Sequence, residues 1–262
     1  MCSVRPLVFA HRGGAALAPE NTIAAFDNGL ELGADGLELD VQLSRDGVPV
    51  VIHDPTLERT TDGAGPLTDW TARELASVDA GYRFTRDGQH PFRGRGIGIP
   101  ALADVLVRYP RTPLIIELKA RDVRLARSVV DAIRAAGAVG HVTVGSFHQG
   151  ALDAVRAYDP AIRTGADIDE VRSGLAAEVF GRHRSRVLFH AFQVPEVYAG
   201  DRIVTPTFVE RAHDAGASVI VWTVDREDDV RRLLDWGVDG IITDRPDAAV
   251  PAVRHWLEER SS

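Results

Sequence analysis

Short apolar runs of strand length alternate along the chain with longer stretches whose apolar residues recur at helical spacing. The apolar runs lie at residues 7–10, 36–42 with 48–52, 114–118, 142–147, 162–168, 187–194, 218–224 and 240–243. The amphipathic stretches lie at residues 21–31, 123–136, 150–158, 170–180, 207–215, 226–236 and 248–259. Because a strand covered on both faces reads as a continuous apolar run, this alternation predicts parallel β/α units.

About eight such units in a chain of 262 residues match the size of one closed (β/α)8 barrel. Gly137, Gly216 and Gly237 each stand between an amphipathic stretch and the next apolar run, where a helix typically ends. An open doubly wound sheet is the competing fold, but the sequence lacks a Gly-rich dinucleotide-binding fingerprint. The pattern therefore predicts an α/β fold, a TIM barrel forming a single domain over residues 1–262.

Residues 55–98 interrupt the alternation. They are rich in turn-forming and polar residues and contain one short helical pattern, at residues 71–80. A loop of this length inside a compact domain is usually functional or a small subdomain. Since it follows the second predicted strand, we expect a small insertion or lid at the C-terminal face of the barrel.

Composition narrows the class of protein. The chain is 45% hydrophobic with a formal net charge of -8, which fits a soluble globular protein and disfavours nucleic-acid or anionic-membrane partners. No run approaches the roughly 18 apolar residues of a membrane span, and the apolar N-terminal run is too short for a signal peptide. Cys2 is the only cysteine and cannot form an internal disulfide, so we expect a cytoplasmic protein. The oligomeric state is not indicated.

Ionisable side chains follow the first predicted strands, at the ends that meet on the catalytic face of a parallel barrel. Glu38 and Asp40 are two residues apart, so they point to the same side of a strand. Three of the apolar runs end in further ionisable residues. The run at 7–10 is followed by His11 and Arg12, the run at 48–52 by His53 and Asp54, and the run at 114–118 ends in Glu117 and is followed by Lys119.

Three of these residues suggest a metal site. A single carboxylate at a strand end is more often solvated or salt-bridged than catalytic. Glu38, Asp40 and Glu117 together would repel one another strongly unless a cation neutralised them. Because all their ligand atoms are oxygens, the cluster suits one divalent Mg²⁺ or Ca²⁺ ion and fits zinc poorly.

The other groups suit an anionic substrate. Arg12 and Lys119 supply positive charge beside the predicted metal, and Lys119 is the only lysine among 30 basic residues. An unperturbed histidine side chain has a pKa of about 6.5, so His11 and His53 are residues of the type that can serve as one base and one acid near neutral pH. This set of groups indicates hydrolysis of a phosphate ester.

These residues occur in an order that resembles the glycerophosphodiester phosphodiesterase family. The resemblance covers nearly the whole chain. It is carried by HRG at 11–13, PENT at 19–22, ELDV at 38–41, DG at 46–47, HDP at 53–55, LERTT at 57–61, IPAL at 99–102, ELK at 117–119, SF at 146–147, VWTV at 221–224 and GIITDRP at 240–246.

The resemblance implies a (β/α)8 barrel with a small insertion after the second strand. It also implies an enzyme of lipid and glycerol metabolism, a phosphoric diester hydrolase that cleaves glycerophosphodiesters to sn-glycerol 3-phosphate and an alcohol. The attacking group would be either a neighbouring glycerol hydroxyl, which forms a cyclic phosphate that water then opens, or water itself. By position, the metal ligands are Glu38, Asp40 and Glu117, the acid and base His11 and His53, and the substrate-binding residues Arg12, Lys119 and Trp222.

Two other functions remain open at this point. A lysophospholipase D-like phosphodiesterase is expected to carry an apolar, membrane-facing insertion, whereas residues 55–98 are mostly polar. A non-catalytic glycerophosphodiester-binding protein is expected to tolerate loss of the histidine pair, and here both histidines are present. Residues 92–98 diverge locally from the family pattern, so the alcohol group of the substrate stays open.

Overall fold

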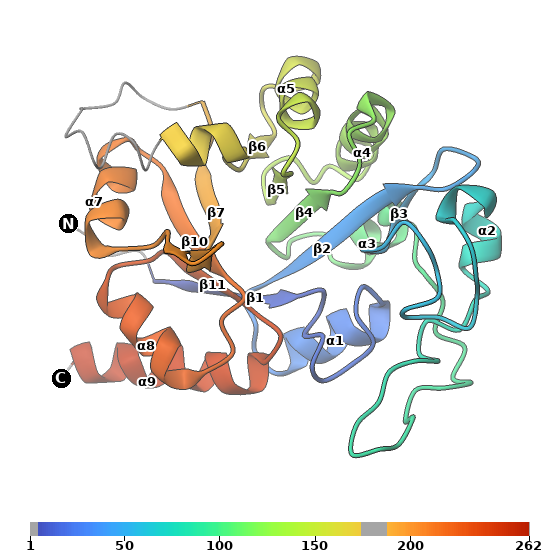
Figure 1. Ribbon diagram of the computed structural model, residues 1–262, viewed down its shortest axis with the longest axis horizontal. Coiled ribbons are helices and arrows are strands. Elements are labelled where there is room, and N and C mark those ends of the chain that lie inside the picture. The colour runs from blue at the N-terminus through green and yellow to red at the C-terminus, as the bar shows by residue number, and fades with distance from the viewer. Residues whose placement is uncertain (1–4, 174–187, 262) are drawn as a thin grey trace.

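Parallel strands form a nearly closed barrel in the computed structural model, which describes residues 5–173 and 188–261 (Figure 1). Neighbouring strands follow the order β6-β5-β4-β2-β1-β11-β10-β7, and a parallel bridge between Gly165 and Ala191 joins the two ends of this order. The strands are β1 (Leu7–His11), β2 (Gly36–Leu43), β4 (Leu114–Leu118), β5 (Val142–Gly145), β6 (Arg163–Thr164), β7 (Ala191–Pro195), β10 (Ser218–Trp222) and β11 (Gly240–Thr243). The described part of the chain is therefore a (β/α)8 TIM barrel.

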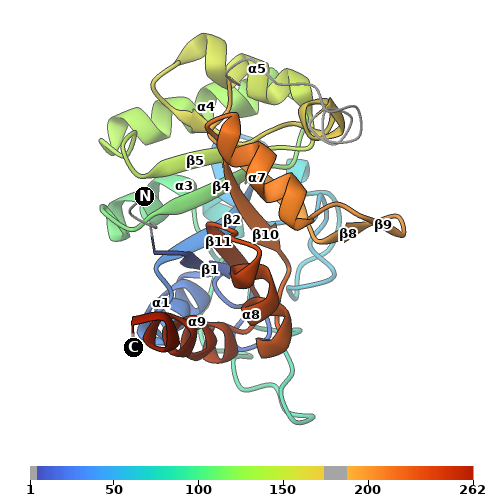
Figure 2. The ribbon, with the colours of Figure 1, turned by 90° about the vertical axis from the view of Figure 1, so that its left-hand side faces the viewer.

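Helices cover the outside of the barrel (Figures 1 and 2). In α4, the buried residues Leu125, Val129 and Ile133 recur every four positions and pack against the sheet. The helices are α1 (Ile23–Glu31), α3 (Leu102–Arg108), α4 (Val123–Ala135), α5 (Gln149–Tyr158), α7 (Pro206–Asp214), α8 (Glu227–Asp235) and α9 (Pro246–Ser261). Among the described residues, no helix combines the length and the apolar character that crossing a bilayer requires.

Apolar side chains also fill the inside of the barrel, where Phe9, Ile115 and Ile242 form a small cluster. The strands are thus apolar on both faces, which explains why their sequences are continuous apolar runs. Two larger clusters lie between the strands and the helices, one around Leu39 and the other around Val221.

The structure departs from the predicted pattern in several places. The run at 48–52 does not extend the second strand: β3 (Pro49–Val51) turns back and pairs with β2 in antiparallel orientation, after a turn in which Gly47 has a φ of +75°. The run at 162–168 contains only the two-residue strand β6. Helix α3 was not predicted, since only seven residues form it. The predicted helix 170–180 extends outside the described residues.

Two small structures extend beyond the barrel. Residues between β3 and α3 contain the 3₁₀ turn η1 (Leu67–Asp69) and helix α2 (Ala72–Leu75), and have their own apolar core that includes Leu57 and Ile99. Strands β8 (Val197–Tyr198) and β9 (Asp201–Arg202) form an antiparallel hairpin that projects from the barrel (Figure 2). The sequence pattern did not predict this hairpin.

We predict that Gly13→Ala destabilises the fold by about 3 kcal/mol, as measured by urea unfolding. Gly13 follows β1 with a φ of +89°, and a Cβ built on it lies 2.6 Å from the Cβ of Ala25 on α1. The control is Gly150→Ala on α5, where a Cβ meets nothing within 4 Å. Its stability should be unchanged or up to about 1 kcal/mol higher. Equal stability of the two variants would contradict this account.

Candidate active site

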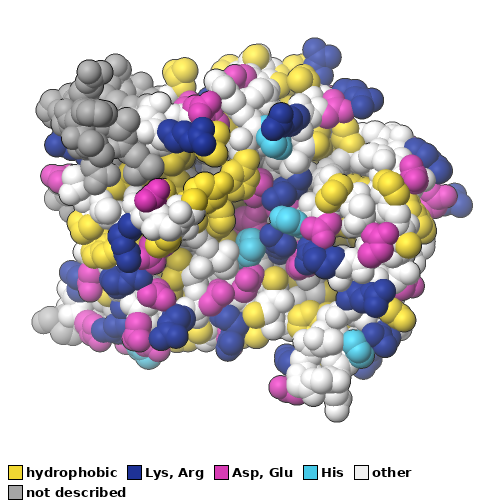
Figure 3. All heavy atoms as spheres, in the orientation of Figure 1, with side chains coloured by type: hydrophobic (Ala, Val, Ile, Leu, Met, Phe, Trp, Pro, Cys, Tyr) yellow, Lys and Arg dark blue, Asp and Glu magenta, His cyan; other side chains and the backbone are white. Residues whose placement is uncertain are grey.

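A cavity of about 420 Å³ opens where the barrel strands end. Charged side chains and histidines line one part of it, and Figure 3 shows them gathered around a hollow. Trp222 lines it from the end of β10 and packs edge-to-face on Phe147, with 5.8 Å between the ring centroids. The predicted residues that line the cavity are His11, Arg12, Glu38, His53, Glu117, Lys119 and Trp222.

The three predicted metal ligands lie together. The parallel register of β2 and β4 places Asp40 opposite Glu117, and one carboxylate oxygen from each of Glu38, Asp40 and Glu117 lies within 4.8 Å of the others. Glu38 and Asp40 are only 4% and 1% exposed. Burial and the neighbouring charge of Asp40 raise the pKa of Glu38 to about 8. This buried, all-oxygen cluster has the chemistry to bind a hard divalent cation.

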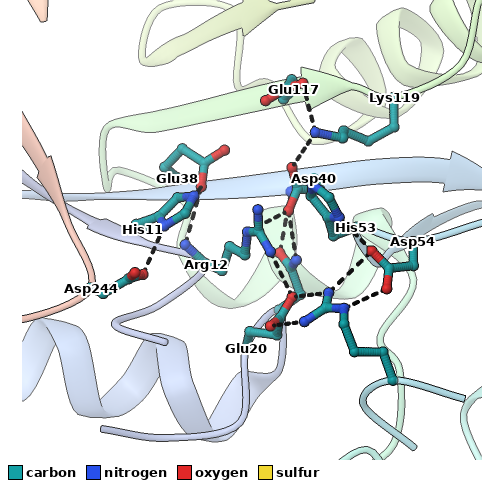
Figure 4. Close-up of polar contacts among 12 residues, drawn as sticks. His11, Arg12, Glu20, Glu38, Asp40, His53, Asp54, Glu117, Lys119 and Asp244 are labelled. Carbon is teal, nitrogen blue, oxygen red and sulfur yellow. Dashed lines mark hydrogen bonds and ion pairs between the residues drawn. The ribbon is translucent and has the colours of Figure 1, made fainter. Parts of the chain in front are cut away.

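Asp40 is the most buried member of the cluster and contacts several polar groups (Figure 4). The side-chain amide of Asn21 donates a hydrogen bond of 2.8 Å to it and accepts one of 3.2 Å from its backbone N–H. Arg12 Nε lies 3.1 Å from one carboxylate oxygen of Asp40, and Lys119 Nζ lies 3.4 Å from the other. Lys119 also donates a 2.8 Å hydrogen bond to Glu117. The positively charged side chains of Arg12 and Lys119 are thus held against the acidic cluster.

Lys119 remains protonated at this position. Burial alone would lower the pKa of its ammonium group, but the charges of Asp40 and Glu117 outweigh burial and raise that pKa. The pKa of the Arg12 guanidinium is likewise raised, because the carboxylates around it outweigh the cost of burial. Both residues line the cavity, so they present positive charge to whatever enters it.

Each histidine of the site is held by a carboxylate. His11 Nδ1 lies 2.7 Å from Asp244, and His53 Nδ1 lies 2.6 Å from Asp54. Ionised carboxylates only accept hydrogen bonds, so Nδ1 carries the proton in both rings and Nε2 is left to exchange protons. Burial would lower the pKa of His11, but the hydrogen bond to Asp244 and the charge of Glu38 outweigh it and raise the pKa.

A chain of ion pairs joins the cavity arginine to the second histidine. Arg12 donates to Glu20 at 2.9 Å, and Arg59 donates two bonds, of 2.7 and 2.8 Å, to the same carboxylate. Arg59 also binds Asp54 through Nε and Nη2, and Asp54 in turn holds His53. Arg59 belongs to the segment between β3 and α3, so this segment contributes directly to the order of the site.

The structure brings together every residue that the sequence indicated. Asp40 alone lies behind the cavity wall, where it contacts Arg12 and Lys119. The contacts of Asp54, Asp244 and Arg59 were not predicted. Asp244 directly follows the last residue of β11. The reasoning that found Glu117, from polar residues at the ends of predicted strands, would therefore also have found Asp244. No periodicity marks Arg59, whose partner Glu20 is 39 residues away in the chain.

We predict that Arg59→Met lowers the free energy of unfolding more at pH 7 than at pH 2. Burial opposes ionisation of Asp54, but its bonds to Arg59 and His53 outweigh burial and lower its pKa from 3.8 to about 2. Because the folded-state pKa is lowered, this stabilisation is present above about pH 4 and is lost as the pH falls toward 2. Urea unfolding at several pH values measures the difference between wild type and variant.

The matched control is Arg226→Met, which removes an exposed arginine whose Nε lies 3.7 Å from Asp229. Exposed pairs of this kind contribute less than about 1 kcal/mol, so the loss should be small at every pH. A difference between wild type and Arg59→Met that stays constant from pH 7 to pH 2 would exclude the proposed pairing with Asp54.

Comparison with known proteins identifies the family. The sequence model of the glycerophosphoryl diester phosphodiesterase family matches residues 11–248. A glycerophosphodiester phosphodiesterase of Caldanaerobacter subterraneus subsp. tengcongensis is 35% identical over 261 residues, covering 96% of this chain and 99% of that protein. The crystal structure of glycerophosphodiester phosphodiesterase from Agrobacterium tumefaciens aligns with a TM-score of 0.75 at 30% identity, covering 94% of this chain and 99% of the other.

An Oleispira antarctica phosphodiesterase, whose structure is a complex with the product sn-glycerol-3-phosphate, aligns with a TM-score of 0.75 at 26% identity. That alignment covers 95% of this chain and 97% of the other. Together, the sequence match over most of the chain and the shared barrel show that this chain belongs to the glycerophosphoryl diester phosphodiesterase family, a family of enzymes.

Proposed function

We propose that this protein hydrolyses glycerophosphodiesters to sn-glycerol 3-phosphate and an alcohol in a reaction that depends on a divalent cation. The proposal rests on one cavity that is lined by two carboxylate-held histidines, by Arg12 and Lys119, and by two members of the three-carboxylate cluster. Its support from relatives is the Oleispira antarctica phosphodiesterase bound to sn-glycerol-3-phosphate. The direct test is release of glycerol 3-phosphate from glycerophosphodiesters by the purified protein.

Glu38, Asp40 and Glu117 would hold the cation, Mg²⁺ or Ca²⁺. When bound, it would supply positive charge against the phosphoryl oxygens of the substrate. Arg12 and Lys119 add their own charge from the cavity wall. Since Asp40 and its neighbours already fix both side chains, their charge acts on the transition state with little reorganisation.

The two histidines would transfer the protons of the reaction. One Nε2 takes the proton of the attacking hydroxyl, which belongs either to water or to the neighbouring carbon of the glycerol. In the second case a cyclic phosphate forms, and water then opens it to glycerol 3-phosphate. The other imidazole, protonated, gives its proton to the oxygen of the departing alcohol. Asp244 and Asp54 hold the Nδ1–H groups, so that Nε2 of each ring is the atom that exchanges protons.

Arg59 acts through other residues in this scheme. It holds Glu20, which orients Arg12, and it holds Asp54, which orients His53. Arg59 does not line the cavity, so we regard it as a positioning residue. The non-catalytic binding function receives no support from the site, because such a protein has no need of two histidines whose tautomers are fixed.

We predict that His11→Gln and His53→Gln each lower kcat by about 10²- to 10⁴-fold at saturating cation and substrate, because each removes a proton-transfer group. Steady-state kinetics of glycerol 3-phosphate release measure the effect. His255→Gln, on the exposed side of α9, is the control and should keep wild-type turnover. Turnover within twofold of wild type in either site variant would exclude that histidine from acid-base catalysis.

We also predict that removal of divalent cations by a chelator abolishes activity and that Mg²⁺ or Ca²⁺ restores it. Calorimetry gives a second readout: Glu38→Gln and Glu117→Gln should each weaken cation binding at least tenfold, since each removes a charged ligand. Glu31→Gln, an exposed acid at the end of α1, controls for net charge and should bind the cation normally. Full activity after exhaustive chelation would rule out the metal requirement.

A further inference from the structure

The cavity has a second part, chemically unlike the first. This part of the wall is built from hydrophobic side chains of β10, the loop after β5, the segment after β6 and the region of the β8–β9 hairpin. These side chains are Phe147, Ile168, Val171, Tyr198, Ile203 and Trp222. We refer to these six residues as the apolar wall. Figure 3 shows hydrophobic side chains beside the histidines and acidic groups of the hollow.

Part of the apolar wall is unusually exposed. Phe147 is 45% exposed and Tyr198 is 53% exposed, although both line the cavity. Large apolar groups that gather in an exposed hollow typically mark a binding surface. Here the surface is continuous with the charged site, so a single ligand can contact both.

The β8–β9 hairpin is held firmly in this position. The backbone carbonyl of Glu196, at its base, accepts hydrogen bonds from the N–H groups of Ile203 and Val204 at 2.8 and 3.2 Å. The carboxylate of Glu196 accepts two bonds from Arg232 on α8, of 2.8 and 2.9 Å. These contacts hold Tyr198 and Ile203 at the cavity, which favours a binding wall over a freely moving loop.

We propose that the apolar wall binds the hydrocarbon part of the substrate alcohol, and that the preferred substrates are diesters of glycerol 3-phosphate with an alkyl or aryl alcohol. This inference rests on the proposed function, because the charged part of the cavity must take the phosphate. The phosphate carries two ester groups. Glycerol has an oxygen on every carbon and gains little from contact with Ile168, Val171 and Ile203, whereas an alkyl group gains from each methylene that it buries.

A quaternary ammonium alcohol is the main competitor, because aromatic rings attract such cations. Two features favour an uncharged group. Arg172 lines the same part of the cavity, and its positive charge disfavours a cation there, although Asp169 pairs with its guanidinium at 3.2 Å. Asp167 also lines it, but one oxygen of this buried carboxylate accepts the backbone N–H groups of Asp169 and Glu170, so the carboxylate is partly occupied.

The test compares four diesters of sn-glycerol 3-phosphate, with methyl, choline, 3,3-dimethylbutyl and n-octyl alcohols. The 3,3-dimethylbutyl group has the shape of choline without its charge, so this pair separates shape from charge. Each methylene buried against the wall should raise kcat/KM about three- to fourfold. We expect the octyl and dimethylbutyl esters to exceed the methyl and choline esters at least tenfold.

Two variants connect this preference to the apolar wall. Phe147→Ser and Tyr198→Ser change exposed side chains, and each should lower the octyl-to-methyl ratio of kcat/KM at least fivefold. Tyr198→Phe, which keeps the ring, should restore the ratio. Val107→Ser on α3 removes a 73% exposed side chain that does not line the cavity, and it should leave the ratio unchanged.

The outcomes that overturn the proposal are distinct from failure of the proposed function. Equal kcat/KM for methyl and octyl esters, or choline above dimethylbutyl, would overturn it, as would serine variants with an unchanged ratio. If no diester released glycerol 3-phosphate, the proposed function would fail. Calorimetry with methyl phosphate and octyl phosphate would then test the apolar wall itself: we expect octyl phosphate to bind at least tenfold more tightly, and equal affinity would overturn the inference.

Discussion

The barrel buries negative charge that it must neutralise, and much of the site follows from this constraint. Glu38 and Asp40 are almost completely buried on one strand, and Glu117 stands beside them on the next. A buried charge without a partner costs several kcal/mol, so these carboxylates need positive charge or hydrogen bonds from the residues around them. Arg12 and Lys119 offer positive charge, and Asn21 offers a hydrogen bond to Asp40.

The same requirement connects the barrel to the segment between β3 and α3. Glu20 accepts hydrogen bonds from one arginine of each part, Arg12 and Arg59. Arg59 extends the network to Asp54 and therefore to His53. Both parts of the protein therefore support the orientation of His53, because Arg59, which holds Asp54, is itself bound to Glu20. The segment is thus part of the site, although its residues form a separate apolar core.

The positions of most strands were predictable from the sequence, because a strand buried on both faces is a continuous apolar run. Most residues of the site were predictable because the carboxyl ends of parallel strands meet at one face of the barrel. Glu38, Asp40 and Glu117 were found in this way. The reversal of β3 was not predicted, because its apolar run resembles that of a parallel strand and only the turn at Gly47 distinguishes it. Arg59 stands in a motif that carries the family resemblance, but its bond to Glu20 was not predicted, because the two residues are distant in sequence. The roles of the site residues remain predictions.

The barrel also has a long side and a short side. Strand β2 has eight residues and lies opposite the seam where the two-residue strand β6 approaches β7 through the bridge of Gly165 and Ala191. Local opening needs less free energy where fewer ladder hydrogen bonds must break. We therefore expect the seam to open before β2, which would place the larger backbone fluctuations away from the acidic cluster.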